Sequence, residues 1–484
     1  MNAENTLQQI LLQPTDVLFF RDGRPMSGSL AGHTAAWPLP DVTNHALHAA
    51  LHRADLQGTH THRRGRSGNY SEERDRKFGC LTTAGPFPVR VADPQGHPLD
   101  PPRWFFPRPK DAELGGSVAV TLRPLAAMGD HGENPWSKSS LPAPLKYAVA
   151  NAQPPRKDAG GEPWISGDAY ATYLREETDV RLEVATHFLE DTHLADTEQT
   201  IGIGINPETQ TQDKTNFYSA HYLRLREGWR LGLFAEARDK QNGSARAKRD
   251  LIRSLFNDHP QRIVVGGQQR ICTASRREAP RPLPLPRGLT DHKSLHKLSQ
   301  GKYAVKWVLL TPAIWPEIPE NKERDITTHP GGWLPNWIHP ETGAVLLKAG
   351  DTSRHDGEGR ERWRQRVRAM PAIAARLVAA IVPKPIVVTG WALGIPGSED
   401  DHPSTATVGG AKSTHLAAPA GAVYYFEADS PEAATQLAAA LNWHGGDTND
   451  AEIKNRRSTL LGEKGYGLGV CGTWEFYPGR DRTS

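Results

Sequence analysis

Residues 421–443 read GAVYYFEADSPEAATQLAAALNW and give the clearest indication of the fold in the chain. The run GAVYYFE (421–427) predicts a buried strand, because it is short, apolar and rich in valine and aromatic residues. Ser430 and Pro431 match the N-cap and the first position of a helix, and the Ala/Leu-rich residues after them continue it. A long loop then leads to a last strand over 469–476. Strand, helix and strand in this order are typical of the split βαβ, or ferredoxin-like, arrangement.

Upstream of this unit, the chain alternates strand-like runs with turn residues, a pattern that favours an α+β fold. A polar break at 238–248 is the expected domain boundary, which divides the chain into residues 1–240 and 250–484. The predicted strands cover residues 181–189, 200–206, 215–226 and 229–236, and lie near 262–268 and 303–311.

The N-terminal region predicts a strand that ends in an exposed basic loop. The strand lies within residues 7–18 and runs into FFRDGRP (19–25), whose Asp-Gly and Arg-Pro pairs are turn chemistry. Arg21 and Arg24 therefore lie on a tight loop at a strand end. Asp41 is the expected N-cap of the next helix, whose apolar face carries Ala46, Leu47, Ala50 and Leu51.

Other segments predict helices and long insertions. Ser166 is expected to cap a short helix over 168–175. The basic region 360–382 predicts a helix that is broken or kinked at Pro371. The polar, basic segment 58–79 and the Pro-, Lys- and Gly-rich segment 129–161 predict irregular surface insertions.

Composition narrows the class of protein. The 484 residues include 58 Lys or Arg and 55 Asp or Glu, for a formal net charge of +3, and the length suggests two to four domains. A mean hydropathy of −0.58 argues against a membrane protein, and 13 Trp argue against a disordered one. Three scattered cysteines predict no disulfide framework, and the first residues show no signal peptide, so a cytoplasmic location is expected.

The glycine cluster GEKGYGLGVCG (462–472) is the main candidate for chemistry, and part of it, 467–472, matches GxGxxG. A dinucleotide fingerprint needs a strand before it and a helix after it, whereas here the order is reversed. The cluster is not a phosphate-binding Walker A loop either, because no GK[ST] ending follows at the required spacing. The remaining interpretations are a phosphate-binding nest, with Lys464, Arg456 and Arg457 close by, and a purely structural turn.

No catalytic constellation is recognisable in the sequence. His45, His48 and His52 share a helical face, but without a nearby Cys or Glu a solvated or RNA-facing helix is favoured over a metal site. Nucleophile elbows, HExxH motifs and EF-hand loops are absent. A single histidine acting as general base for RNA cleavage would leave no signature, so an endoribonuclease stays open as an alternative.

Several segments, in order along the chain, resemble one family: the third subunit of the Cmr complex, which is the type III-B CRISPR effector, within the RAMP superfamily. LQPTDVLFFRDGRP (12–25) resembles the family's N-terminal signature. IGIGIN (201–206) and NFYSAHYLRL (216–225) resemble its central segment. The other matching segments are VGGQQR (265–270), LLTPA (309–313), PAGAVYYF (419–426), the glycine-rich loop from 462 to 467, and GTW (472–474).

The resemblance implies two ferredoxin-like (RAMP/RRM-like) domains with long loop insertions and a C-terminal glycine-rich loop. It implies a non-catalytic RNA-binding subunit of an antiviral ribonucleoprotein that anchors the repeat-derived 5′ handle of the crRNA. Its partners would be the large polymerase-like subunit and the backbone subunits, with target RNA met indirectly and no cofactor, metal or membrane. The alternative is a RAMP-family endoribonuclease that processes CRISPR repeat RNA. The expected RNA-binding residues are Arg21, Arg24, Arg270, Arg456, Arg457, Lys464, Gly465, Tyr466, Gly467 and Gly469.

Overall fold

A computed structural model describes most of the chain. The described ranges are residues 7–20, 30–32, 37–56, 81–114, 116–125, 141–150, 163–176, 181–205, 208–237, 250–298, 301–321, 327–355, 357–392, 410–411, 413–446 and 452–477. The segment 58–79 and the residues Arg21 and Arg24 lie outside them. So does most of the segment 129–161.

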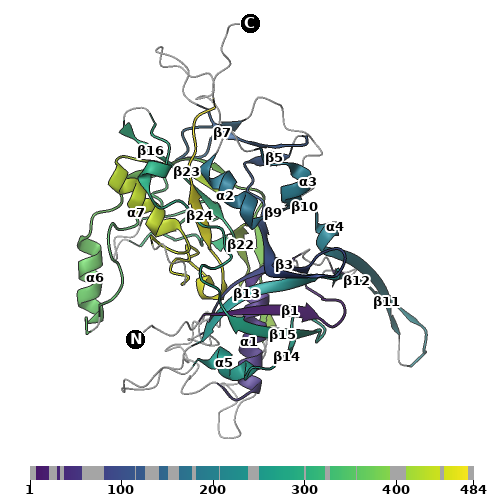
Figure 1. Ribbon diagram of the computed structural model, residues 1–484. Helices are drawn as coiled ribbons and strands as arrows, with labels where there is room; N and C mark the ends of the chain where they lie inside the picture. The colour runs from purple at the N-terminus through teal and green to yellow at the C-terminus, as the bar shows by residue number, and fades with distance from the viewer. Residues whose placement is uncertain are drawn as a thin grey trace.

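In the described ranges, the largest sheet has eight strands in the order β10-β9-β4-β3-β13-β1-β15-β14 (Figure 1). Four neighbouring strands pair antiparallel and are β3 (Leu81–Ala92), β13 (Trp229–Ala237), β1 (Gln8–Pro14) and β15 (Ile271–Glu278). Beyond β3 lie β4 (Pro98–Pro107), β9 (Trp164–Ser166) and β10 (Phe188–Leu189), and beyond β15 lies β14 (Gln261–Val264).

Two helices cover one face of this first sheet. Helix α1 (Pro40–Arg53) and helix α5 (Leu251–Phe256) pack in one core with Ile10 and Leu12 of β1. Because side chains alternate along a strand, Ile10 and Leu12 point to the same face. The helices contribute Ala46, Leu47, Ala50, Leu51, Leu251, Ile252, Leu255 and Phe256 to that core, so the predicted apolar face of α1 is confirmed.

The second sheet has four antiparallel strands in the order β18-β23-β16-β24. Helix α7 (Pro431–Leu441) packs on it, and Ser430 Oγ accepts a hydrogen bond from the Ala433 amide at 3.1 Å, so the predicted cap is confirmed. The strands are β18 (Ala375–Ile381), β23 (Val423–Ala428), β16 (Tyr303–Leu309) and β24 (Gly469–Gly472).

The two sheets share one connection pattern. When the four strands of each set are numbered by their order in the chain, they lie side by side as second, third, first and fourth. The first sheet does so with β3-β13-β1-β15 and the second with β18-β23-β16-β24. The boundary expected at 238–248 lies outside the described residues. Because β15 pairs with β1 from Cys272 to Glu278, the strands of the first sheet come from both sides of that segment.

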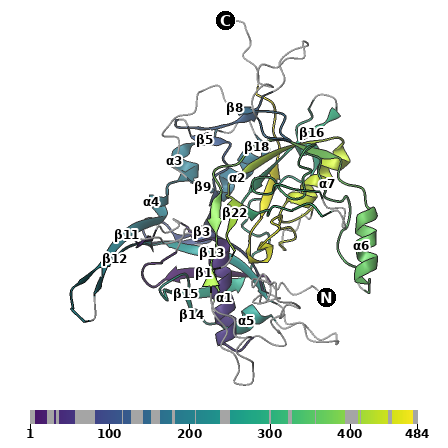
Figure 2. The same ribbon diagram turned by 180° about the vertical axis from the view of Figure 1, so that it is seen from behind.

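Smaller elements extend from the two sheets. A long hairpin of β11 (Ala195–Ile205) and β12 (Gln212–Leu225) projects from the body, with β2 (Leu30–Gly32) parallel to β12 (Figure 2). The remaining elements are β5 (Ala112–Leu114), β6 (Ala119–Thr121), β7 (Arg123–Pro124), β8 (Val149–Ala150), α2 (Gly167–Arg175), α3 (Val184–His187), α4 (Asp191–Leu194), η1 (His292–Ser294), β17 (Ala313–Ile314), α6 (Arg360–Ala369), β19 (Ile386–Val388), β20 (Trp391–Ala392), β21 (Gly410–Ala411), β22 (His415–Ala418) and η4 (Gly462–Lys464).

Three local predictions are wrong. Residues 181–189 form the short helix α3 and strand β10, because the His187 amide bonds back to the Glu183 carbonyl at 3.1 Å. The predicted helix over 360–382 ends at Ala369, and residues 375–381 form β18, paired with β23. Asp41 lies in the first turn of α1 rather than at its N-cap, which is Leu39.

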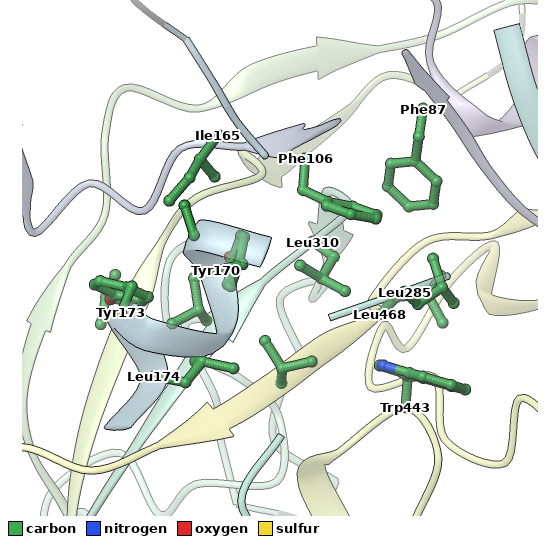
Figure 3. Packing of buried hydrophobic residues seen from close by; sticks show 14 of the residues in the cluster. Phe87, Phe106, Ile165, Tyr170, Tyr173, Leu174, Leu285, Leu310, Trp443 and Leu468 are labelled. Atoms are coloured by element: carbon green, nitrogen blue, oxygen red, sulfur yellow. The ribbon is translucent and has the colours of Figure 1, made fainter. Parts of the chain in front are cut away.

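One apolar core joins the two sheets (Figure 3). Phe106 of the first sheet contacts both Phe87 of the same sheet and Tyr170 of α2, while Leu310 and Trp443 enter the same core from residues after Glu278. The Ala169 amide donates to Ser166 Oγ at 3.4 Å, so the predicted cap of this helix is confirmed as well. Within the described ranges, no helix has the length and apolar character needed to cross a membrane.

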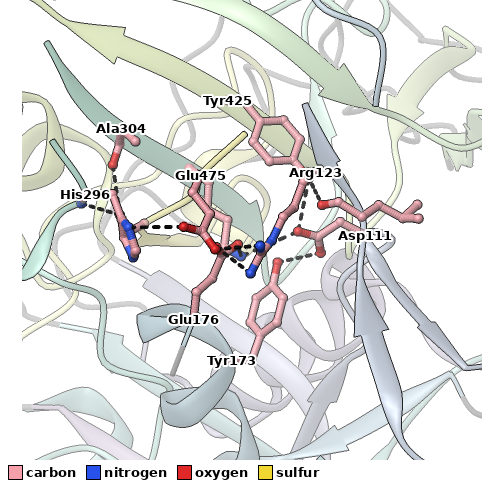
Figure 4. Close-up of polar contacts among 11 residues, drawn as sticks. Asp111, Arg123, Tyr173, Glu176, His296, Ala304, Tyr425 and Glu475 are labelled. Atoms are coloured by element: carbon pink, nitrogen blue, oxygen red, sulfur yellow. Dashed lines mark hydrogen bonds and ion pairs between the residues drawn. The ribbon is translucent and has the colours of Figure 1, made fainter. Parts of the chain in front are cut away.

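A buried cluster of charges also joins the two halves (Figure 4). Lys306 on β16 is fully buried, and its Nζ lies 3.0 Å from Glu176 Oε1 and 3.5 Å from Asp111 Oδ2. Tyr173 and Tyr425 donate to the same Asp111 carboxylate at 2.5 and 3.1 Å. Burial raises the pKa of Asp111, while the Lys306 charge opposes that rise. Because each half neutralises buried groups of the other, separating them would leave uncompensated charges.

Candidate nucleic-acid interface

Three of the segments that carry the family resemblance meet at one corner of the first sheet. The centre is a tight turn, residues 265–270, which we call the Gly266 turn. The Val265 amide donates to the Arg270 carbonyl at 2.8 Å, and the Gly267 amide donates to the Phe19 carbonyl at 2.8 Å. Gly266 has φ +78°, and a Cβ there would lie 2.5 Å from the Phe19 oxygen, so only glycine suits the position.

Tyr222 of β12 supports the Gly266 turn. Its hydroxyl donates to Gln268 Oε1 at 2.9 Å, and its ring lies 5.5 Å from the Phe19 ring. The Arg270 guanidinium lies over the Tyr222 ring at 4.8 Å from its centroid, a cation–π geometry. Since the Arg270 side chain keeps 29% of its surface exposed, the turn presents a positioned cation to solvent.

Two arginines share an acidic neighbour beside the Gly266 turn. Arg224 Nη2 lies 2.9 Å from Asp16 Oδ1, and Arg270 Nη1 lies 3.8 Å from Asp16 Oδ2. Arg224 also donates to Glu198, and that hydrogen bond raises the pKa of the guanidinium above its ordinary value. All four groups are partly or fully exposed, so a phosphate can compete with the Asp16 carboxylate for both arginines.

The expected contacts Arg21 and Arg24 follow this corner in the chain. They lie outside the described residues, and Phe20 is the last described residue before them. Phe20 is buried, and its ring would lie 2.9 Å from a Cβ on Gly266. The Gly266 turn therefore packs on the residue that immediately precedes Arg21.

The glycine loop, residues 462–469, lies elsewhere, between α1 and the second sheet. Lys464 is 9% exposed, with its Nζ 3.0 Å from His45 Nε2. The Tyr466 side chain is completely buried, and its hydroxyl donates to Asp41 Oδ1 at 2.7 Å. Burial raises the pKa of Tyr466 well above its ordinary value. In this conformation the Tyr466 ring has no exposed face on which a base could stack, so the expected stacking contact does not fit.

Protein atoms fill the space beside the glycines of this loop. A Cβ on Gly467, where φ is +78°, would overlap the Ser458 amide nitrogen. A Cβ on Gly469 would overlap the Trp307 ring, and one on Gly465 would lie 3.2 Å from the Thr83 oxygen. These glycines permit close packing of the chain on itself rather than the approach of a phosphate in this conformation.

Arg456 and Arg457 are half-buried near the carboxyl end of α7. Arg457 Nε donates to the Ala440 carbonyl at 2.6 Å, and Arg456 Nη1 donates to the Ile453 carbonyl at 3.2 Å. Burial lowers the pKa of each guanidinium to about 10. The Arg457 cation satisfies one of the last carbonyls of the helix and interacts favourably with the helix dipole. Arg457 therefore serves the packing of α7 in this conformation, whereas Arg456 bonds to a carbonyl of its own loop.

The three histidines on one face of α1, His45, His48 and His52, do not converge on one point. His48 Nε2 lies 3.2 Å from His52 Nε2, whereas His45 contacts Lys464. Among the described residues, no group of three or more His, Cys, Asp or Glu is placed to hold a metal ion.

Sequence reasoning missed Tyr222 and Gln268. Both lie inside segments singled out for their resemblance, YLRL and VGGQQR, but nothing in either segment indicates that they meet. Tyr222 and Arg270 are 48 positions apart, so their pairing depends on the fold.

Nearly the whole chain matches the model of one known protein family. The family model described as CRISPR-associated protein (Cas_Cmr3) matches residues 10–474. A similar chain occurs in the cryo-EM structure of the type III-B Cmr-beta bound to cognate target RNA and AMPPnP, state 1, with 13% identity, 86% of each chain covered and a TM-score of 0.35. The type III-B Cmr-beta bound to cognate target RNA contains another, with 13% identity, 86% of each chain covered and a TM-score of 0.32. No curated protein matches the chain.

Proposed function

The chain belongs to the Cas_Cmr3 family of CRISPR-associated proteins, as its ordered segments predicted, and from this premise we propose that it is an RNA-binding subunit of a type III-B CRISPR ribonucleoprotein. Its task would be to anchor the repeat-derived 5′ handle of the crRNA. Its partners would be the large polymerase-like subunit and the backbone subunits. The related chains lie in complexes bound to target RNA, and this chain would meet that RNA indirectly.

The observation that carries the proposal is the Gly266 turn. It places the Arg270 guanidinium on the Tyr222 ring at 4.8 Å and keeps it accessible to solvent. A guanidinium held in this way loses little freedom on binding, and arginine suits the bidentate recognition of phosphate. Arg21 and Arg24 would add phosphate contacts from the segment that starts beside it.

For the glycine loop we propose an indirect role. Tyr466 and Lys464 fasten this loop to α1 of the first half through Asp41 and His45. The loop would thus fix the relative placement of the two sheets, and with it the surface that RNA meets. Gly465, Gly467 and Gly469 would act by allowing this close packing, Arg457 by holding the end of α7, and Arg456 by holding the loop before the glycines at the Ile453 carbonyl.

We also infer that both sheets are ferredoxin-like units. The order second-third-first-fourth, antiparallel throughout, is that of the split βαβ arrangement, and it occurs in each. In the first, α1 and α5 lie in the two crossovers, whereas in the second α7 alone packs on the sheet. The division between the units would then fall after Glu278.

The proposal is tested with purified full-length chain and a repeat-derived RNA that carries the 5′ handle. We expect the chain to bind this RNA and to leave it at full length, with or without a divalent metal. Metal-independent cleavage at one position, abolished by a single histidine substitution, would establish the endoribonuclease alternative instead. No binding to handle RNA would refute the proposal.

A further inference from the structure

Helix α6 is a basic element that the proposed function leaves unused. Its sequence, RERWRQRVRA, carries five arginines and one glutamate, and none of its residues is buried. Figures 1 and 2 show it standing at the margin of the molecule, away from the body of the second sheet. A helix with no buried face gains little from packing, so its place in the fold needs another explanation.

The preceding loop holds α6 in place through one arginine and one tryptophan. Arg366 Nε donates to Glu358 Oε1 at 2.9 Å, and its Nη1 donates to the Asp351 carbonyl at 2.9 Å. Trp363 Nε1 donates to the Thr352 carbonyl at 3.0 Å. The Arg366 hydrogen bond lowers the pKa of Glu358 to about 2, so the clamp is charged at neutral pH. The other arginines are not needed for this attachment.

Three of those arginines form one stripe. Arg360, Arg364 and Arg368 are spaced four residues apart, so they share one face along about 12 Å of helix. All three are exposed, and in the described ranges none of them forms an ion pair. Like charges at this spacing repel one another, which weakens the helix unless an external anion compensates them.

We propose that this stripe binds the phosphate backbone of single-stranded RNA, as a second contact separate from the Gly266 turn. Guanidinium groups pair with phosphate oxygens in bidentate geometry. Arginine also occurs in protein interfaces, but the buried centre of such an interface is mostly apolar and the stripe offers no apolar residue, so RNA phosphate matches the stripe better. The inference rests on the proposed function only in assuming that RNA reaches this protein.

The test uses full-length chain and a labelled polyuridine RNA, which has no repeat sequence. The triple variant R360Q/R364Q/R368Q should bind it roughly tenfold to a hundredfold more weakly at 0.1 M salt. The slope of log K against log salt should become shallower by about 2, because three contacts to a single strand each contribute about 0.7. The matched triple lysine variant should retain the slope, since it retains the charge.

A second variant keeps the proposal testable if the triple glutamine variant unfolds. Glu361→Gln removes the acid beside the stripe and leaves the clamp intact, so it should tighten polyuridine binding about twofold to threefold. Unchanged slope and affinity in a folded triple variant would refute the stripe. Unchanged RNA binding with loss of an acidic protein from the assembled complex would assign the stripe to a protein partner instead. If the triple variant binds handle RNA normally in either of these two outcomes, the proposed function is unaffected.

Discussion

The Gly266 turn and the glycine loop look alike in sequence, since both combine glycines with nearby basic residues, but they differ in what surrounds them. At the Gly266 turn, the guanidinium of Arg270 lies on Tyr222 and remains 29% exposed. In the glycine loop, Lys464 is 9% exposed and Tyr466 is completely buried against α1. One glycine element presents a cation to solvent, whereas the other packs two halves of the protein together.

This difference shows that a glycine-rich sequence with adjacent cations does not by itself identify a ligand site. Glycine is required wherever any backbone or side chain approaches closely, whether it belongs to a ligand or to the protein. The deciding observation is the identity of the neighbouring atom. Gly467 faces the Ser458 amide, so the glycine loop should respond to substitution as a core does.

The largest effect is expected for Gly467→Val in the glycine loop. The positive φ and the overlap with Ser458 should together destabilise the protein by about 2–6 kcal/mol. Denaturant unfolding measures the loss, with Gly462→Ala as a near-neutral control, because a Cβ there meets only Arg456 Cβ at 3.5 Å. If the Gly467→Val protein has normal stability but no longer binds RNA, the glycine loop contacts RNA directly.

Tyr466→Ala should be nearly as severe. Removing a fully buried aromatic ring costs about 3–5 kcal/mol, whereas Tyr466→Phe should lose only the hydrogen bond to Asp41, about 0.5–1.5 kcal/mol. Unfolding curves are recorded beside RNA titrations of the folded fraction, which should bind normally. Normal melting of Tyr466→Ala with weakened RNA binding would mean that the ring stacks on a base after all.

At the Gly266 turn, the effect should appear in binding rather than stability. Arg270→Ala should weaken handle RNA roughly fivefold to tenfold and reduce the salt slope by about 0.7, with a change in unfolding free energy below about 1 kcal/mol. Arg270→Lys should restore the slope and only part of the affinity, because lysine cannot form the same bidentate contact. A large loss of stability with an unchanged slope would make Arg270 a structural residue.

The smallest effect is expected for Tyr222→Phe. The substitution keeps the ring beneath Arg270 and removes only the hydrogen bond to Gln268. It should therefore lower the free energy of unfolding by about 0.5–1.5 kcal/mol. RNA affinity, measured by the same titration, should stay within about threefold of the wild type. A tenfold loss would show that the Gln268 contact, and not the ring, positions the arginine.

Local patterns in the sequence determined those features that depend on near neighbours. Strand β23 (Val423–Ala428), expected at 421–427, the Ser430 cap with Pro431, and the Ser166 cap all follow from residues that are close together in the chain. The ordered segments determined the family, because their spacing along the chain can be read without knowing any contact. The dinucleotide interpretation of the glycine cluster failed on the order of elements alone.

Tertiary structure decided which glycine element faces solvent and which strands complete each sheet. Tyr466 finds Asp41 across 425 positions, and β15 joins β1 rather than the strands that follow it. Residues 375–381 form a strand because β23 offers a partner, although their apolar run suits a helix equally well. Burial, pairing and ring contacts depend on atoms brought together from distant parts of the chain, and no local pattern of residue types specifies which distant atoms those will be.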